Sequence, residues 1–100
     1  MKRLSNRQEQ VMALIWKHGP LTVSRLIPLI GEHLHFNTIS TVVRELDRIG
    51  FLGHDNESRP FLYYPNITKD GYIKELIDSI SYRFFNGDKE KLAKCINPKS

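Results

Sequence analysis

The residues best suited to bind another molecule lie in one stretch, FNTISTVVRELDRIGFL, which runs from Phe36 to Leu52. If this stretch is helical, successive side chains turn by about 100°, and a line of hydroxyl groups and arginines forms along one face. The two acidic residues of the stretch fall at the margins of this line. Hydroxyl and guanidinium groups can hydrogen-bond to base edges and neutralise phosphates, so the stretch predicts a helix that recognises an acidic partner. The side chains on the line are Ser40, Arg44 and Arg48, with Thr41 beside them.

The opposite face of the same helix is apolar and should be buried. Asn37 or Thr38 is expected to cap the helix, and Gly50 stands where helices commonly end. The uncapped N–H groups of the first turn would favour a phosphate. The apolar face consists of Ile39, Val42, Val43, Leu46 and Ile49, which fall within roughly 120° of one another.

Other groups of chemical interest are weaker candidates. His33 and His35 could share a metal, but no further ligand type stands nearby in sequence, and solvated loop histidines are the alternative. His54 and Asp55 could form a pH-sensitive pair or an ordinary polar pair at a strand end. The aromatic residues are expected to pack in the core and hairpin, because neighbouring strand residues point to opposite faces rather than forming one stacking platform. They are Trp16, Phe61, Tyr63 and Tyr64.

The sequence lacks the usual patterns of an enzyme. It contains no Gly-rich phosphate loop, no Ser or Cys nucleophile with a base at a recognisable spacing, and no catalytic carboxylate pair. Cys95 is the only cysteine, so neither an internal disulfide nor a thiolate zinc cluster is possible. We therefore expect a non-enzymatic protein without a cofactor.

Two amphipathic helices should precede the recognition stretch. Ser5 and Gln8 resemble a capping box in front of a helix from about Asn6 to His18. Thr22 can cap a second helix, in which apolar residues recur at helical spacing. Pro28 lies inside that helix, which must therefore be short or kinked.

A hairpin and a long helix should follow the recognition stretch. Residues 51–55 and 61–65 read as strands around a polar tip that carries Arg59, placed to reach a phosphate or a minor groove. Residues from Thr68 to the Asn86-Gly87 stop read as a helix, and a short tail helix should follow over Asp88 to about Ile96. The long helix has an apolar stripe that a small domain cannot cover, so it should form a dimer interface. The stripe residues are Ile73, Leu76, Ile77, Ile80 and Phe84.

This order of elements defines the expected fold. It is a mainly α fold with a small β-hairpin: a winged helix-turn-helix domain over residues 1–67 and a C-terminal helical dimerisation segment over residues 68–100. One hundred residues suit this size. A net charge of +4 favours an acidic partner only mildly, since 8 basic and 6 acidic residues precede Asn66 and 7 and 5 follow Pro65. The sequence shows no bilayer-spanning run and no signal peptide, which predicts a cytoplasmic protein without stable membrane association.

Three segments resemble the penicillinase-repressor (BlaI/MecI) family of winged-helix transcriptional repressors, over nearly the whole chain. They are LSNRQEQVMALIWKHGPLTV, NTISTVVRELDRIGFLGH and YYPNITKDGYIKELI. The resemblance implies a homodimer that binds an inverted-repeat operator in double-stranded DNA. It also implies that the residues in groove-facing positions are Asn37, Thr38, Ser40, Thr41 and Arg44.

The resemblance further implies how repression ends. A membrane-bound sensor protease system would trigger cutting in the C-terminal helical region, here within about Phe84 to Ile96. Family members usually continue with a further helix that completes the dimer, whereas this sequence ends with KEKLAKCINPKS. Dimer strength therefore does not carry over from the family, and a cut there would remove little interface.

A second class of function fits the same elements. A winged-helix module without sequence-specific DNA binding could use the line of Ser40, Arg44 and Arg48 to dock a protein. Arginines in line fit phosphate better than an apolar partner. The salt dependence of binding separates the two classes, because counterion release makes DNA binding weaken steeply with added salt.

Overall fold

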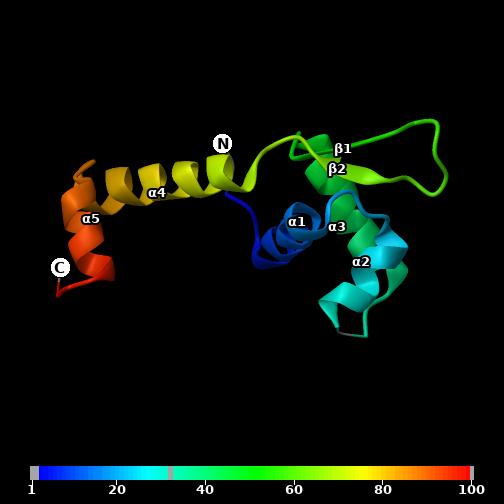
Figure 1. The fold of residues 1–100 in the computed structure, drawn as a ribbon, viewed down its shortest axis with the longest axis horizontal. Coiled ribbons are helices and arrows are strands. Elements are labelled where there is room, and N and C mark those ends of the chain that lie inside the picture. Colours follow the sequence, from blue (N-terminus) through cyan, green and yellow to red (C-terminus); the bar gives the residue numbers. More distant parts are fainter. Residues whose placement is uncertain (1–2, 32, 100) are drawn as a thin grey trace. The chain divides into compact units, whose positions relative to one another are not determined.

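The computed structural model describes residues 3–31 and 33–99, and its elements follow the expected order (Figure 1). The fold is mainly helical with one two-stranded antiparallel hairpin, as predicted. The chain divides into two compact units, one that ends at Lys69 and one that begins at Asp70. The elements are α1 (Asn6–His18), α2 (Val23–Ile30), α3 (Phe36–Arg48), β1 (Leu52–His54), β2 (Tyr63–Pro65), α4 (Lys69–Phe85) and α5 (Lys89–Ile96).

Side-chain caps start the first two helices where the sequence predicted them. The backbone N–H of Gln8 donates to Ser5 Oγ at 3.2 Å, and the Ser5 N–H donates to Gln8 Oε1 at 2.9 Å, which completes a capping box. The Arg25 N–H donates to Thr22 Oγ1 at 3.3 Å and caps α2. With Pro28 inside it, α2 is only eight residues long, so the expectation of a short helix is confirmed.

The helices α1, α2 and α3 enclose the core of the first unit together with the hairpin. The expected apolar face of α3 is buried at Ile39, Val43 and Leu46, whereas Val42 and Ile49 are half-buried. Each fully buried aliphatic side chain contributes roughly 1.5–3 kcal/mol relative to an exposed one. This packing fixes which face of α3 points outward. The fully buried side chains of this unit include Val11, Met12, Ile15, Leu26, Ile39, Val43, Leu46 and Leu52.

The start of α3 differs from the prediction. Neither Asn37 nor Thr38 is the N-cap: the helix begins at Phe36, with His35 in the N-cap position and no side-chain cap bond. The His35 carbonyl accepts from the Thr38 N–H at 3.0 Å, so the backbone itself closes the first turn. The recognition stretch is therefore helical from Phe36 onward, and Asn37 and Thr38 lie inside the first turn.

The end of α3 is set by a Schellman motif. The N–H of Phe51 donates to the Leu46 carbonyl at 2.9 Å, and the N–H of Gly50 donates to the Asp47 carbonyl at 3.1 Å. Gly50 has a φ of 90°, a left-handed value that side-chain-bearing residues rarely adopt. Phe51 and Leu46 are both buried, as the apolar contact of this motif requires. The motif turns the chain directly from α3 into β1.

The hairpin is shorter than predicted, with three paired residues in each strand instead of five. Gly53 pairs with Tyr64 and His54 with Tyr63. Tyr63 is buried and Tyr64 is exposed, so neighbouring rings do point to opposite faces. A backbone bridge outside the hairpin joins Tyr63 to Leu21, with N–H to carbonyl distances of 2.9 and 3.0 Å. This bridge joins the hairpin to the segment that connects α1 and α2.

The second unit consists of α4 and α5. The Asp88 carboxylate accepts from the N–H groups of Glu90 and Lys91 at 3.0 and 3.2 Å and starts α5. Lys89 Nζ lies 2.8 Å from Asp78 Oδ1, which links the two helices. The expected helix ends are confirmed, since α4 stops at Phe85 before Asn86 and Gly87, both with positive φ.

The apolar stripe of α4 is largely uncovered. Ile73, Ile77 and Ile80 are 40%, 41% and 39% exposed, and Phe84 is 70% exposed. Leu76 is half-buried. Such a row on one helix is an apolar surface available to a partner.

Candidate nucleic-acid interface

A groove of about 520 Å³ lies within the first unit, between α3, the start of α2 and the wing, which we define as residues 52–65. It brings together arginines from α3 and from the wing that are 11 or more positions apart in the sequence. The groove is lined by Val23, Ser24, Phe36, Ser40, Arg44, Asp47, Arg48, His54, Arg59, Pro60, Phe61 and Tyr63.

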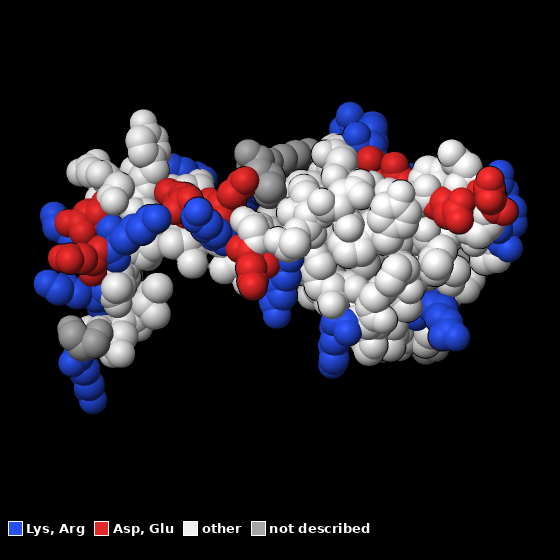
Figure 2. Space-filling view, turned by 45° about the horizontal axis from the view of Figure 1, so that its top comes forward, with Lys and Arg blue, Asp and Glu red and all other residues white. Residues whose placement is uncertain are grey.

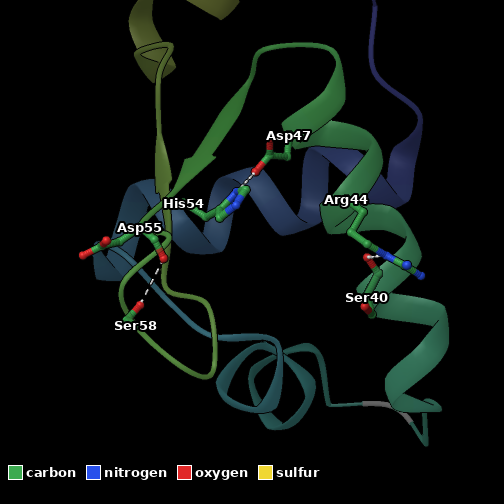
Figure 3. A network of polar contacts seen from close by, with 6 residues as sticks. All are labelled: Ser40, Arg44, Asp47, His54, Asp55 and Ser58. Carbon is green, nitrogen blue, oxygen red and sulfur yellow. Dashed lines mark hydrogen bonds and ion pairs between the residues drawn. The ribbon is translucent and has the colours of Figure 1, made fainter.

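Among the three arginines of this groove, Arg44 is held least tightly by its neighbours. Its side chain is exposed, and its Nε donates only to the backbone carbonyl of Ser40, one turn earlier, at 3.4 Å (Figure 3). Thr41 Oγ1 donates to the Asn37 carbonyl at 2.8 Å. Asn37 and Thr38 are exposed at the helix start, and they do not line the groove.

Arg48 is partly neutralised by a neighbour on its own helix. Its Nη2 lies 2.5 Å from Glu45 Oε1 and its Nε lies 2.8 Å from Glu45 Oε2, which makes a two-pronged ion pair. The hydrogen bond that Arg48 donates to Glu45, and then the negative charge of Glu45, raise the pKa of Arg48. Glu45, which was expected at the margin of the line of hydroxyl groups and arginines, therefore pairs with an arginine of that line.

Arg59 folds back over the wing. Its guanidinium lies 4.2 Å from the centre of the Phe61 ring, a cation–π contact. Its Nη1 also donates to the carbonyls of Asn56 and Ser58, at 3.2 and 3.1 Å. These contacts hold the wing arginine beside the groove.

His54 joins the wing to the recognition helix. Its Nδ1 contacts the carboxylate of Asp47 on α3 and not that of Asp55 beside it, so the pH-sensitive pair of His54 and Asp55, one of the two alternatives from the sequence, is not formed (Figure 3). Asp55 instead accepts from the Glu57 N–H at 2.9 Å within the wing tip. The strand points His54 toward α3, and an adjacent residue in a strand necessarily points elsewhere.

Rings from the wing pack around this link. The His54 ring centre lies 4.5 Å from that of Phe61 and 5.7 Å from that of Tyr63. Burial, and secondarily the charge of Asp47, raise the pKa of the Tyr63 hydroxyl, while Arg44 opposes this effect. Trp16 Nε1 donates to the Ile67 carbonyl at 2.8 Å, on the segment that follows the wing. The aromatic residues thus pack the wing, as expected, except that Tyr64 is exposed.

The remaining sequence candidates lie outside the groove. His33, His35 and Cys95 are exposed. Over residues 3–31 and 33–99, no three His, Cys, Asp or Glu side chains are arranged to hold a metal ion. Within the same residues, no helix is both long and apolar enough to cross a membrane.

Charge is distributed differently on the two units. On the face shown in Figure 2, acidic and basic side chains alternate along the helical unit, whereas the winged unit presents a broad uncharged surface with both basic and acidic side chains at its margins. Local arrangement rather than net charge must therefore direct a partner to the winged unit.

Two solved structures share this fold. One is the solution structure of the monomeric form of Bacillus licheniformis BlaI in complex with the blaP half-operator, with a TM-score of 0.59 at 32% identity over 71% of this chain and 89% of that one. The other is the DNA-binding domain of the repressor BlaI, with a TM-score of 0.60 at 32% identity over 72% of this chain and 94% of that one. The fold is thus that of a winged-helix DNA-binding domain.

The family follows from the sequence comparisons. The pattern of the penicillinase repressor family matches residues 4–97. The penicillinase repressor of Bacillus licheniformis is 33% identical over 87 residues, which cover 85% of this chain and 68% of that protein. The chain belongs to the penicillinase repressor family, a family of DNA-binding transcriptional repressors, and the resemblance inferred from its motifs is confirmed.

Proposed function

We propose that this repressor binds double-stranded DNA sequence-specifically, as a homodimer on an inverted-repeat operator. The observation that carries the proposal is the groove, in which Arg44 and Arg48 of α3 lie together with Arg59 of the wing. A helix in the major groove and a wing beside it would place these cations along one DNA strand. The half-operator complex of the related BlaI supports this reading. Operator DNA lies in the cytoplasm, so the proposal includes that location.

The proposed contacts divide into two kinds. Polar side chains near the start of α3 read base edges, because the N-terminal part of a recognition helix approaches them most closely. Arg48 and Arg59 serve phosphates, since Arg48 is shared with Glu45 and Arg59 is held at the wing. The base-reading group comprises Asn37, Thr38, Ser40, Thr41 and Arg44.

The proposed dimer uses the second unit. We assign DNA binding to residues 1–67 and dimerisation to residues 68–100, with the α4 stripe as the interface. The exposure of Ile73, Ile77, Ile80 and Phe84 supports this assignment. Two coupled α3 helices would then bind half-sites about 10 base pairs apart, and the linkage would raise the overall affinity above that of one half-site.

Binding to a selected operator at several salt concentrations tests the function. The operator would come from genomic fragments retained by the protein. We expect a protected pseudo-palindrome and an affinity that falls steeply with salt. A weak salt dependence with equal affinity for all sequences would instead favour a module that docks a protein through Ser40, Arg44 and Arg48.

We further propose that repression ends when the second unit is cut. A membrane-bound sensor protease system would trigger cutting near Asn86 and Gly87, where both residues leave helical geometry. Removing everything after Phe85 mimics such a cut but keeps the α4 stripe up to Phe84. If cutting is the switch, α5 must support the dimer, and the truncated chain should bind the operator more weakly because its half-sites are uncoupled. Unchanged dimerisation and binding after this truncation would exclude the mechanism.

A further inference from the structure

Phe36 is a large exposed apolar side chain at the start of the recognition helix. It is 51% exposed, although it lies in the first turn of α3 and lines the groove. Phe61, on the opposite wall, is half-buried beneath Arg59 and against His54. Among residues 3–31 and 33–99, no ring or cation stacks on Phe36. About half of this ring is therefore exposed on the surface that is proposed to meet DNA.

The position of Phe36 on α3 aligns it with the arginines. Residues four apart are offset by only about 40° around a helix, so Phe36, Ser40, Arg44 and Arg48 follow one another along the outer face. All four line the same groove. Contact between DNA and Arg44 would bring Phe36 to the bases at the N-terminal end of α3, where recognition helices approach base edges.

We propose that Phe36 contacts the 5-methyl group of a thymine in each half-site and so determines the preferred base at that position. The major-groove edges of the base pairs carry polar groups, and the thymine methyl is the one apolar group among them. A phenyl ring cannot hydrogen-bond, so the other edges gain nothing from it and lose hydration. This inference rests on the proposed DNA-binding function and adds a specificity residue to it.

The test replaces each thymine of the selected operator with deoxyuridine, which removes only the methyl group. With the full chain, one thymine per half-site should be sensitive, and its replacement in both half-sites should weaken binding roughly three- to tenfold. Phe36→Ala should lose a similar factor on the thymine operator. It should then show no further loss on the deoxyuridine operator, because the two changes remove the same contact.

Two further variants serve as a conservative substitution and a matched control. Phe36→Leu retains part of the apolar contact and should give an intermediate loss. Leu29→Ala removes another exposed apolar side chain, from α2 and outside this groove, and should bind like the wild type. Helix content measured by circular dichroism identifies any variant that fails to fold. The comparison of thymine and deoxyuridine operators with the wild-type protein does not depend on the folding of any variant.

The outcomes separate this inference from the function on which it rests. Normal operator preference with no methyl-sensitive thymine, or with equal deoxyuridine losses in wild type and Phe36→Ala, would overturn the role of Phe36 alone. A wild type that does not distinguish operator from random DNA would overturn the proposed function and, with it, this contact.

Discussion

At the scale of single residues, the charges around the groove are unequally available. Arg48 shares its charge with Glu45, and Arg59 is held over Phe61. Within residues 3–31 and 33–99, the only hydrogen bond of the Arg44 side chain is a long one to a backbone carbonyl. Because a free guanidinium can reach two acceptors on a guanine edge, Arg44 is the strongest candidate for base recognition.

Replacing Arg44 and Arg59 should therefore have different effects. Arg44→Ala should weaken operator binding by about 1–3 kcal/mol and relax sequence preference, whereas Arg59→Ala should weaken operator and random DNA alike. Fluorescence anisotropy on both duplexes measures the difference. Equal losses on the two duplexes for Arg44→Ala would contradict its assignment to a base edge.

The contact between His54 and Asp47 should contribute to the stability of the winged unit. His54→Ala removes a hydrogen bond to a charged group, worth ~1.5–3 kcal/mol when buried. Both side chains are between one-quarter and one-third exposed, so we expect a loss of about 1 kcal/mol in urea unfolding. His54→Asn keeps an N–H near the position of Nδ1 and should recover part of it. Identical losses in both variants would mean that ring packing, not the bond to Asp47, is what matters.

At the scale of elements, the ends of α3 position the groove. The helix starts at Phe36 without a side-chain cap and ends in the Schellman motif at Gly50. The first boundary places Phe36 within α3, on the side that lines the groove, and the second turns the chain directly into β1. The wing and the recognition helix thereby become two walls of one groove.

Gly50 should be sensitive to substitution. Its φ of 90° is strained for any residue with a Cβ, so Gly50→Ala should destabilise the winged unit by about 1–2 kcal/mol. In the described part of the chain, no atom other than those of Gly50 and its two neighbours lies within 4 Å of an added Cβ, so backbone conformation rather than collision is the cause. Gly50→Asn should cost less, because asparagine tolerates left-handed geometry. Chemical denaturation ranks the three proteins, and an alanine variant as stable as wild type would refute the explanation.

The link between α4 and α5 should depend on pH. The hydrogen bond from Lys89 holds the pKa of Asp78 below its ordinary value. A lowered folded-state pKa stabilises the pair above the ordinary pKa, and this contribution is lost as the pH falls through the folded value. Helix content of the wild type should therefore decrease more between about pH 5 and pH 2 than that of Asp78→Asn. Parallel acid titrations of the two proteins would argue against a role for this pair.

At the scale of the whole molecule, the exposed apolar stripe of α4 is the surface through which we expect two copies of the chain to pair. Apolar side chains in a row on an exposed helix are stabilised by a second copy of the same surface. The repressor proposal needs such a pairing, because one α3 helix reads only one half-site. On the unit from Asp70 onward, acidic and basic side chains alternate on the face shown in Figure 2.

Ile80→Asp should convert dimers into monomers. Placing a carboxylate in an apolar interface costs several kcal/mol, and Ile80 is 39% exposed in the single chain, so α4 itself should persist. Sedimentation velocity reports the assembly, and circular dichroism reports the helix. Tyr82→Ala, at a 78% exposed residue outside the stripe, is the matched control. A wild type that stays monomeric at high concentration would defeat the prediction.

Local patterns in the sequence determined the elements and the outward line of Ser40, Arg44 and Arg48. Caps, helical periodicity and glycine stops act between residues within about six positions of one another. The Ser5 cap, the buried side of α3 and the stop at Gly50 could therefore be predicted.

Tertiary structure alone decided the contacts between distant residues. The Leu21 bridge to Tyr63 spans more than forty positions, and no local pattern marks either partner. The choice of Asp47 over Asp55 by His54 depends on how β1 folds back against α3. The same packing turns Phe36 and the wing arginine toward one groove. Such pairings depend on the backbone path between the partners, and burial of the common core sets that path.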